Sequence, residues 1–515
     1  MNTWLLDKLK SKKDDRGIAI INRDEKISYS KLWDNSELIA EFIKMNSDNK
    51  TPIIIYGNKN IEIVEVMIAA LKNGKAYIPI DITFPEDRVK KIQQISKAEI
   101  IFNFSENEIN IDDKDIKILN NNDLKELLKN KLCNIITEND WVTEENTCYI
   151  LFTSGSTGEP KGVPISKKNI MNFVNWFNDI SKINGSVALN QVSYSFDVSV
   201  IQLYLYLPNG KTLFCIDKGM ISDFGELFKY LNKSNISSWV STPSFIEMCM
   251  VYDSFNEELL PKLEKIILAG EILTKKLVRA LNERFPKVEI INGYGPTEGT
   301  VLLTCCTITD KMLNDEENEL PIGYLLPDAD YKIERVKEKD ELQLSKDVAN
   351  KGELIVSSNS ISNGYYNNEI ETKKKFKYNK KNNNMTYKTG DIVYKIDDLL
   401  YYCGRKDFQI KLNGYRIELD DICENINKID CVNNNIVMPV YKDGRVQYIV
   451  SFVVLKKKQE VQLKKDNIKV NLYIRKELSK LIPSYMIPKK IVIMEKFPLN
   501  VNGKIDRKEL MEKYL

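Results

Sequence analysis

Residues 151–162, LFTSGSTGEPKG, combine glycines, hydroxyl side chains and a lysine directly behind the apolar run CYILF. Glycine permits tight turns whose exposed N–H groups attract anions, and the hydroxyls and Lys161 add further donors. The usual P-loop is excluded, because there Gly-Lys is followed by Ser or Thr and then a helix, whereas here Pro160 precedes Lys161 and Gly162 follows it. These residue types predict a phosphate-binding loop, and a mobile polar surface loop is the alternative.

The chain contains no histidine. This excludes Ser-His-Asp and Cys-His hydrolysis, histidine-ligated zinc and a histidine general base. The nine cysteines are scattered and form no Cys-x-x-Cys pair. Such a pattern predicts reduced thiols rather than a disulfide framework or a zinc site, and it favours a cytoplasmic protein.

The length and the charge of the chain limit the possible classes of protein further. With 515 residues, two or more domains are expected. Lys and Arg number 75 and Asp and Glu 73, and this balance gives no sign of a nucleic-acid partner. The N-terminal stretch lacks the apolar core of a signal peptide, and no apolar run approaches about 18 residues, so no membrane insertion is expected.

Between residue 52 and about residue 320, stretches typical of strands alternate with stretches typical of helices, and these elements could position the loop. Helices are expected at 61–74, closed by Gly74, and at 222–235. Buried strands are expected at 51–57, 76–80, 99–104, 147–153, 186–192, 211–216, 237–243, 265–270 and 288–295. Alternation of strands and helices predicts mainly parallel sheets covered on both faces, with ligands beyond the carboxyl ends of the strands.

The pattern changes after residue 320. The stretches 351–358, 386–396 and 399–405 predict short strands joined by turns. We therefore expect an α/β fold. A large N-terminal domain, 1–403, would have mainly parallel sheets flanked by helices and a small β subdomain at about 320–403. A small α+β C-terminal domain would occupy 404–515.

Seven motifs follow one another in a fixed order: CYILFTSGSTGEPKG, SYSFDVSV, INGYGPTEGT, KGELIVSS, YKTGD, YYCGRKDFQIKLNGYRIEL and PLNVNGKIDRKEL. This series resembles the amino-acid adenylation enzymes of the adenylate-forming superfamily over nearly the whole chain. That group includes the adenylation domains of nonribosomal peptide synthetases and the D-alanine–carrier protein ligases. The length, the N-terminal match and FDVSV beside QLY make the ligases the nearest kin.

The resemblance implies a two-step reaction that uses ATP and Mg²⁺. A carboxylate attacks the α-phosphate of ATP, and a phosphopantetheine thiol then takes the acyl group as a thioester. No Gly-Gly dipeptide occurs, so the usual carrier attachment motif is absent and the thiol is expected on a separate carrier protein.

The resemblance also implies an ATP site. Its expected residues are Thr153, Ser154, Gly155, Ser156, Thr157, Gly158, Lys161, Gly270, Glu271, Asn292, Gly293, Tyr294, Gly295, Pro296, Thr297, Asp391, Cys403, Gly404, Arg405 and Lys504. The first seven match the loop that grips the β- and γ-phosphates, Tyr294 would stack on adenine, and Thr297 would contact the α-phosphate.

Four polar residues have more specific implied roles. Glu298 would hold Mg²⁺, since a hard cation prefers carboxylate and phosphate oxygens. Asp391 would accept both ribose hydroxyls, with Arg405 beside it. Lys504 matches the catalytic lysine, whose ammonium would stabilise charge at the α-phosphate. Asp407 begins the hinge about which the mobile small domain would rotate between the two half-reactions.

Asp197 matches the aspartate that pairs with a substrate α-amino group, which favours an amino acid as substrate. The other expected pocket positions are Val198, Ile201, Val240, Ile267, Ala269, Gly293, Val301 and Leu302. All are apolar or glycine, so an apolar side chain is expected. The D-alanine ligases tend to have cysteine in place of Ala269. Because Ala269 and Gly293 are expected to leave room for a larger side chain, both D-alanine and a larger apolar amino acid remain candidates.

Two alternatives remain at this point. The first is an acyl-CoA synthetase for a non-amino carboxylic acid, which usually lacks the counterpart of Asp197. The second is a catalytically inactive binding protein, against which the intact Glu298, Asp391 and Lys504 argue.

Overall fold

The computed structural model describes residues 4–47, 50–111, 113–155, 158–182, 185–335, 351–442, 445–457, 469–498 and 505–514. The chain forms two compact units. The first comprises Met1–Ile82, Gln93–Phe152 and Gly162–Asp407, and the second Thr83–Ile92, Thr153–Lys161 and Phe408–Leu515.

The first sheet of the first unit is built around the buried run IIIYG. In the order β6-β5-β3-β4-β7-β8, its described strands are β6 (Lys117–Asn120), β5 (Ile100–Asn103), β3 (Ile53–Gly57), β4 (Tyr77–Asp81), β7 (Thr147–Thr153) and β8 (Lys161–Ser166). β3 pairs in parallel with both β4 and β5, and every residue of these three strands is buried. Continuous apolar runs of this kind are typical of parallel strands that are covered on both faces.

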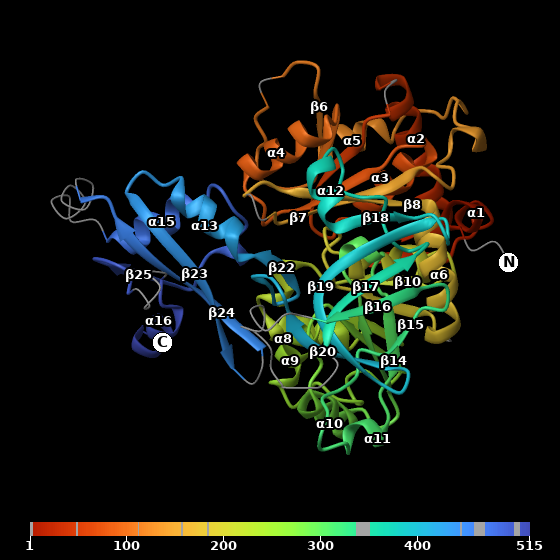
Figure 1. Ribbon diagram of the computed structural model, residues 1–515. Coiled ribbons are helices and arrows are strands. Elements are labelled where there is room, and N and C mark those ends of the chain that lie inside the picture. Colours follow the sequence, from red (N-terminus) through yellow and green to blue (C-terminus); the bar gives the residue numbers. More distant parts are fainter. Residues whose placement is uncertain are drawn as a thin grey trace. The chain divides into compact units, whose positions relative to one another are not determined.

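Two long helices pack together beside this sheet (Figure 1). α2 (Tyr29–Asn46) begins where the Ser28 hydroxyl accepts a hydrogen bond from the Lys31 N–H. α3 (Ile61–Lys72) is almost entirely buried and is followed by Gly74 in the left-handed region, at a φ of 65°. The short helices of this region are α1 (Leu5–Lys10) and α5 (Asn121–Leu127). α4 (Glu86–Ser96) begins in the segment Thr83–Ile92 of the second unit and ends in the first.

A second, larger sheet has a parallel centre and antiparallel edges. Among the described residues its order is β15 (Tyr324–Leu325), β14 (Thr304–Thr307), β13 (Glu289–Tyr294), β12 (Lys265–Ala269), β11 (Ser238–Ser241), β9 (Val187–Asn190), β10 (Thr212–Cys215), β1 (Ile18–Asn22) and β2 (Glu25–Ser28). The six strands from β13 to β1 are parallel, and β2, β14 and β15 pair antiparallel at the edges.

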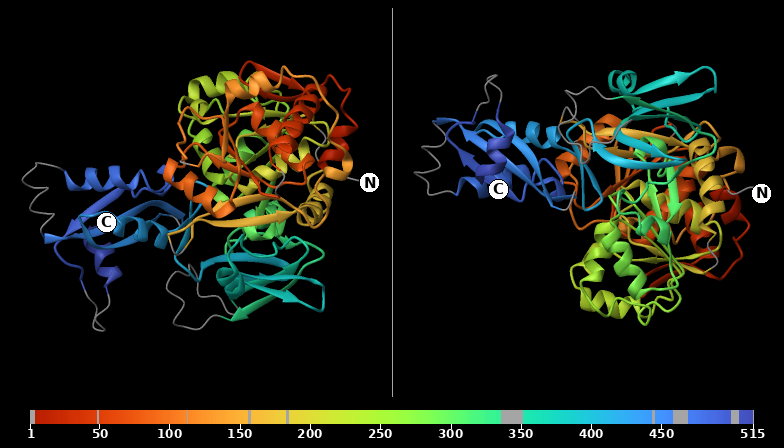
Figure 2. Two further views of the ribbon diagram at one scale, coloured as in Figure 1. Left: turned by 90° about the horizontal axis from the view of Figure 1, so that it is seen from above. Right: turned by 60° about the horizontal axis from the view of Figure 1, so that its bottom comes forward.

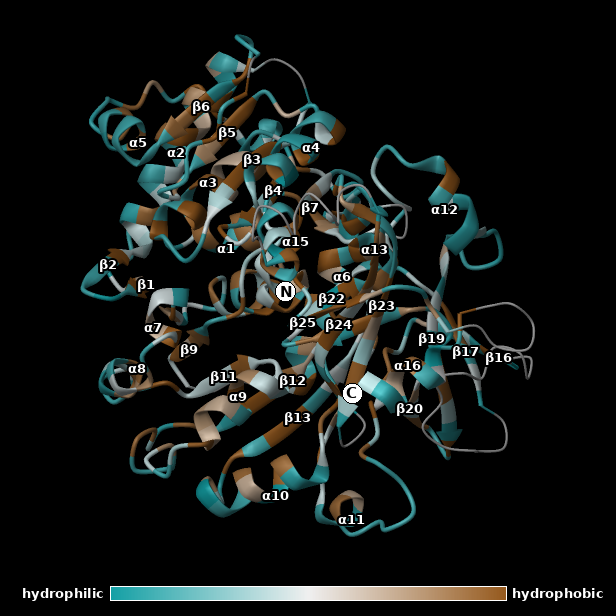
Figure 3. Ribbon diagram, turned by 90° about the vertical axis from the view of Figure 1, so that its left-hand side faces the viewer, coloured by the Kyte–Doolittle hydropathy of each residue, from teal (hydrophilic) through white to brown (hydrophobic). Residues whose placement is uncertain are grey.

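The two faces of this sheet pack into different hydrophobic clusters, because side chains alternate along each strand. Ile266 and Leu268 of β12 join one cluster with residues of α8 (Phe224–Leu231), α9 (Pro243–Met250) and α10 (Lys275–Arg284). Ile267 and Ala269 join the other, together with residues of α6 (Lys167–Ser181) and of the first sheet. Figure 3 shows β12 and β13 mostly in the colours of apolar residues, whereas α10 contains both hydrophilic and hydrophobic residues.

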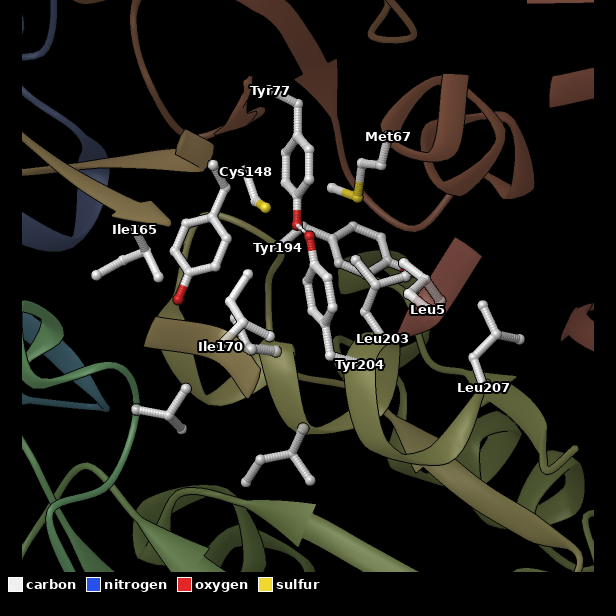
Figure 4. Packing of buried hydrophobic residues seen from close by; sticks show 14 of the residues in the cluster. Leu5, Met67, Tyr77, Cys148, Ile165, Ile170, Tyr194, Leu203, Tyr204 and Leu207 are labelled. Atoms are coloured by element: carbon white, nitrogen blue, oxygen red, sulfur yellow. Dashed lines mark hydrogen bonds between the residues drawn. The ribbon is translucent and has the colours of Figure 1, made fainter. Parts of the chain in front are cut away.

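The cluster shared by the two sheets contains several buried tyrosines (Figure 4). The hydroxyls of Tyr77 on β4 and Tyr204 lie 3.1 Å apart and are hydrogen bonded. Tyr204 belongs to a five-residue π-helical turn, Gln202–Tyr206. A buried hydroxyl needs such a partner, since leaving it unpaired costs about 1–3 kcal/mol.

A smaller, antiparallel sheet follows in the first unit. Its described strands are β16 (Asp330–Arg335), β17 (Gly352–Ser358), β18 (Phe376–Asn379), β19 (Asn384–Ile396) and β20 (Leu399–Arg405). They appear in teal and light blue in Figure 2, with α12 (Glu369–Lys375) beside β18 and β19. Two further short helices, α7 (Lys218–Ile221) and α11 (Asp310–Leu313), belong to the same unit.

The second unit combines strands and helices around its own core. A hairpin of β21 (Gln409–Leu412) and β22 (Tyr415–Glu418) precedes α13 (Leu419–Asn427). A sheet follows, made of β23 (Val432–Lys442), β24 (Arg445–Leu455) and β25 (Lys490–Met494). The helices α15 (Val470–Leu478) and α16 (Arg507–Tyr514) complete the described part.

The α/β class and the helix-flanked sheets expected from the sequence are confirmed. All nine strands expected between residues 51 and 295 are present. The structure adds the hairpin of β1 and β2, which turns at Arg23 with a φ of 55° and places β1 against β10. Over the described residues, no helix combines the length and the hydropathy needed to cross a membrane.

Candidate active site

The expected amino-acid pocket lies near the carboxyl ends of β11, β12 and β13. Val240 pairs with Ile267 across β11 and β12, and Ala269 pairs with Gly293 across β12 and β13. Ile267 and Ala269 are two residues apart, so they share one face of the sheet. The register therefore brings four of the expected pocket residues together on one face.

The remaining expected pocket residues lie in other segments of the chain. One hydrophobic cluster contains every expected apolar side chain of the pocket: Val198, Ile201, Val240, Ile267, Ala269, Val301 and Leu302. Each of these side chains is at most 4% exposed. These residues, which span more than a hundred positions of the sequence, thus belong to one large buried core that also contains residues of the first sheet.

The space beside Gly293 is already filled. A Cβ atom built at this glycine would lie 2.9 Å from both methyl carbons of Leu302. Gly293 therefore accommodates the Leu302 side chain and adds no free room, contrary to the expectation from the sequence. The Leu302 side chain thus covers Gly293 on this face of the sheet.

Leu302 is placed by a strained turn that the sequence did not indicate. Val301 has a φ of 70°, and the Leu302 N–H donates to the Thr300 carbonyl at 2.9 Å, which defines a classic γ-turn. Such a conformation costs a β-branched residue about 1–3 kcal/mol. Gly295 is required here, because a Cβ atom at that position would lie 2.4 Å from the Val301 carbonyl oxygen.

Asp197 begins a short 3₁₀ turn, Asp197–Ser199, and is only 6% exposed. It directly precedes Val198, a member of the pocket cluster. Asp197 is thus a nearly buried carboxylate that is next in sequence to an apolar member of that cluster.

A second group of polar residues is centred on Asp391, which is 3% exposed. Asp391 lies opposite Arg405 in the pairing of β19 with β20, and Arg405 Nη1 donates to Asp391 Oδ1 at 2.6 Å. The Tyr294 hydroxyl donates to Asp391 Oδ2, also at 2.6 Å. Burial and the neighbouring carboxylate raise the pKa of Tyr294 well above its usual value, so its hydroxyl stays protonated and donates.

Arg405 also connects Asp391 to the end of the first unit. Its Nε and Nη2 donate to the two carboxylate oxygens of Asp407 at 2.7 and 2.9 Å. Asp407 is the last residue of that unit. Cys403 is buried and Gly404 has a φ of 132°, both within β20.

Glu298 lies in a short 3₁₀ turn, Thr297–Gly299, and is fully buried. The Tyr365 hydroxyl donates to Glu298 Oε1 at 2.8 Å. Pro296 precedes the turn and is buried, and Thr297 is half-buried. A carboxylate oxygen accepts more than one hydrogen bond or cation, so this contact is compatible with a hard metal ion at Glu298.

Three further residues of the expected ATP site lie at or just after the ends of β12 and β13. Asn292 Nδ2 donates to the Pro321 carbonyl at 2.8 Å, and Gly270 has a φ of 90°. Glu271 Oε2 accepts from the N–H and the hydroxyl of Ser244 in the first turn of α9. These residues shape the loops that follow β12 and β13.

The loop after β7 belongs to the second unit. Thr153 ends β7, Lys161 begins β8, and Gly158 has a φ of 75°. The Ser154 hydroxyl accepts from the Glu418 N–H at 2.9 Å and donates to the Arg416 carbonyl at 3.2 Å. The expected phosphate-binding hydroxyl is thus already hydrogen bonded to the backbone of β22.

A Cβ atom built at Gly155 would lie 2.1 Å from the Glu159 carbonyl oxygen, so this turn requires glycine. Three expected site residues lie outside the described residues: Ser156, Thr157 and Lys504.

Sequence reasoning missed Tyr365, the hydrogen-bond partner of Glu298. It lies 67 residues from Glu298 and carries no motif of its own. It also missed Lys59, which is 1% exposed and lies two residues after the end of the strand β3, in the run GNKN. A lysine so close to the end of a fully buried strand was the available signal.

Comparison with known proteins gives a consistent result. Residues 8–366 match the AMP-binding enzyme family, and residues 424–504 match the AMP-binding enzyme C-terminal domain. The chain is 38% identical over 501 residues to the D-alanine–D-alanyl carrier protein ligase of Bacillus licheniformis, covering 96% of each chain. It is 37% identical over 495 residues to the ligase of the same name from Bacillus cereus, covering 96% of this chain and 95% of the relative.

Solved structures share the fold at lower identity. The adenylation domain AlmE of Vibrio cholerae, in complex with glycyl-adenosine-5′-phosphate, matches with a TM-score of 0.77 and 18% identity, over 100% of this chain and 98% of that one. The o-succinylbenzoate CoA synthetase of Bacillus subtilis matches with a TM-score of 0.81 and 18% identity, over 99% and 98%. From the family match over most of its length and the identity to its relatives, this chain belongs to the AMP-binding enzyme family.

Proposed function

We propose that this protein is an AMP-forming acid–thiol ligase. It activates an apolar amino acid with ATP as an aminoacyl-adenylate and transfers it to the phosphopantetheine thiol of a separate carrier protein. The names of the curated relatives support this assignment, since they are D-alanine–D-alanyl carrier protein ligases at 37–38% identity.

The buried Asp197 beside an entirely apolar cluster is the observation that carries the proposal. In this assignment Asp197 pairs with the substrate ammonium, and the apolar residues receive the side chain. A non-amino carboxylic acid has no ammonium group with which Asp197 could pair in this way. This argues against the alternative, an acyl-CoA synthetase for such an acid.

D-Alanine is the substrate that the pocket supports best. Leu302 occupies the space beside Gly293, and Ala269 is 1% exposed, so little room is left at this end of the pocket. A larger apolar amino acid is the second candidate, and its basis is the small side chain of Ala269.

ATP recognition is assigned to Asp391 with its two hydrogen-bond partners and to the loop that follows β7. Asp391 would accept the ribose hydroxyls, and Arg405 and Tyr294 would fix its carboxylate in place through the hydrogen bonds described above. The glycine- and hydroxyl-rich loop from Thr153 to Lys161 would bind phosphate oxygens through N–H groups, hydroxyls and the lysine.

Two charged residues would act at the phosphates. Glu298 would hold Mg²⁺, which would supply positive charge at the phosphate oxygens when bound. Lys504 would stabilise the charge that develops at the α-phosphate during adenylate formation.

The domain assignment is part of the same proposal. Residues 1–403 would carry the ATP and amino-acid sites, with the β-rich subdomain at about 320–403. Residues 404–515 would form the small domain that carries Lys504 and rotates about a hinge near Asp407. The division between the two compact units after Asp407 supports this hinge. A cytoplasmic location is proposed from the nine free thiols.

ATP–pyrophosphate exchange with a panel of acids tests the proposal. D-Alanine should give the highest rate, L-alanine and glycine lower rates, and leucine and phenylalanine the lowest. Exchange that requires a non-amino carboxylic acid, with none for any amino acid, would establish the acyl-CoA synthetase alternative instead. The highest rate with leucine or phenylalanine would favour the second candidate substrate.

A further inference from the structure

A buried polar network lies where strands of the first and the second sheet of the first unit end. Lys59 follows β3 and Asp81 ends β4 in the first sheet, whereas Asn190 ends β9 and Cys215 ends β10 in the second. All four residues are at most 1% exposed. None of them belongs to the expected ATP or amino-acid site.

Lys59 makes three contacts with one segment of the chain. Its Nζ donates to Asn190 Oδ1 at 2.7 Å and to the Val192 carbonyl at 2.5 Å, and it lies 3.7 Å from the centre of the Tyr194 ring. Asn190 Nδ2 in turn donates to the Tyr194 hydroxyl at 2.7 Å and to Cys215 Sγ at 3.3 Å. Tyr194 packs in the same cluster as Tyr77 and Tyr204 (Figure 4).

Asp81 binds the same segment one residue further along. The Ser193 hydroxyl donates to Asp81 Oδ2 at 2.7 Å, and Lys218 pairs with Asp81 Oδ1. Ser193 also hydrogen bonds to the Ser195 hydroxyl at 3.0 Å, and its carbonyl accepts from the Phe196 N–H at 3.0 Å. Asp197 follows directly. The segment from Asn190 to Phe196 is thus held from the first sheet at three consecutive positions, 192, 193 and 194.

We propose that Lys59 and Asp81 are positioning residues for the amino-acid site, acting through the 190–196 segment that carries Asp197. This inference rests on the proposed role of Asp197. A short segment without regular structure does not fix a side chain by itself, whereas hydrogen bonds from a rigid sheet do. The network would therefore determine amino-acid affinity and have little effect on ATP.

The chemistry of Lys59 supports a role beyond packing. Burial lowers its pKa to about 7, so its positive charge is unfavourable at this place. The groups facing it from the surrounding elements are Asn190, Tyr194, Cys215 and, at longer range, Asp81. A methionine would fill a similar volume without this cost, so a lysine here suggests that its hydrogen bonds are needed.

A matched control exists in the same unit. Lys72 is also fully buried, and it donates to Ser36 Oγ at 2.9 Å and to Glu37 Oε1 at 2.6 Å, both on α2. Burial lowers the pKa of Lys72 to about 8. Its contacts do not involve the 190–196 segment. Lys72→Met therefore removes an equally buried lysine without disturbing the loop that carries Asp197.

The experiment measures the KM values for D-alanine and for ATP in pyrophosphate exchange, together with the melting temperature. Lys59→Met and Asp81→Asn should raise the D-alanine KM by about 10- to 100-fold, the loss expected when a reacting group is displaced by about 1 Å, with the ATP KM unchanged. Lys59→Gln, which keeps a donor, should recover part of the loss. Lys72→Met should lower the melting temperature and leave both KM values at the parent level.

The inference is overturned if Lys59→Met lowers the melting temperature as Lys72→Met does and leaves the D-alanine KM unchanged. If Lys59→Met does not fold, Ser193→Ala removes a single anchor of the segment, and an unchanged D-alanine KM in that variant overturns the inference as well. A parent protein that shows no exchange with any amino acid would refute the proposed function itself, so the two failures are distinguishable.

Discussion

The hydroxyl of Tyr294 offers a sharp test of the ATP site, because one atom can be removed while the ring is kept. Tyr294→Phe deletes the donor to Asp391 Oδ2, a 2.6 Å hydrogen bond between two residues that are 6% and 3% exposed. A hydrogen bond to a buried carboxylate is worth about 1.5–3 kcal/mol. If Asp391 binds the ribose, Arg405 is then the one partner left, among the described residues, to orient its carboxylate. The ATP KM should therefore rise about 10- to 150-fold.

The assay is pyrophosphate exchange at saturating D-alanine with ATP varied, and Tyr204→Phe is the matched control. Tyr204 is equally buried and loses only its hydrogen bond to Tyr77. Its variant should lose stability and keep the parent ATP KM. A Tyr294→Phe variant whose stability falls while its ATP KM matches that of Tyr204→Phe would refute the reasoning and show that the hydrogen bond is structural only.

Three further outcomes are expected. Lys504→Ala should abolish pyrophosphate exchange and spare thioester formation from supplied aminoacyl-adenylate, and normal exchange would rule out the catalytic role. Ala269→Leu should lower the ratio of kcat/KM for leucine to that for alanine, since overpacking costs about 1–3 kcal/mol, and an unchanged ratio would place Ala269 outside the pocket. Burial raises the pKa of Glu65 from its ordinary value of 4.5 to about 7. Between these two values the folded protein keeps a proton that the unfolded chain releases, so stability falls as pH rises through this window. Glu65→Gln should therefore be about 3 kcal/mol more stable than the parent near pH 8 and equal to it near pH 4 in denaturant unfolding, and a difference that does not depend on pH would contradict the shift.

The strands and helices of the core could be predicted because their signals are local. IIIYG is a continuous apolar run, and the helix 61–72 ends at a glycine that adopts a positive φ. The hairpin of β1 and β2 was missed, because its turn at Arg23 uses a left-handed residue without glycine or asparagine. Its partner β10 lies almost 200 residues away, so nothing nearby in the sequence indicates the pairing.

Sequence motifs predicted which residues belong to the site, but they did not predict how these residues contact one another. The motifs named Asp391 and Tyr294 separately, but their hydrogen bond joins residues 97 positions apart. The motifs also named Gly293 without showing that Leu302 fills the space beside it. That arrangement depends on a γ-turn at Val301, a β-branched residue for which sequence preferences exclude a positive φ. Long-range contacts and strain of this kind arise from packing and leave no local pattern.

Pyrophosphate exchange with D-alanine and with propionate, in the parent and in Asp197→Ala, tests the central claim most directly. The two acids differ in the ammonium group that Asp197 is proposed to bind. The parent should use D-alanine and not propionate, and Asp197→Ala should lose about 2–5 kcal/mol, roughly 30- to 5000-fold, in kcat/KM for D-alanine with the ATP KM unchanged. Equal use of D-alanine by both proteins, or a parent that prefers propionate, would contradict the assignment of this chain as an amino-acid-activating ligase.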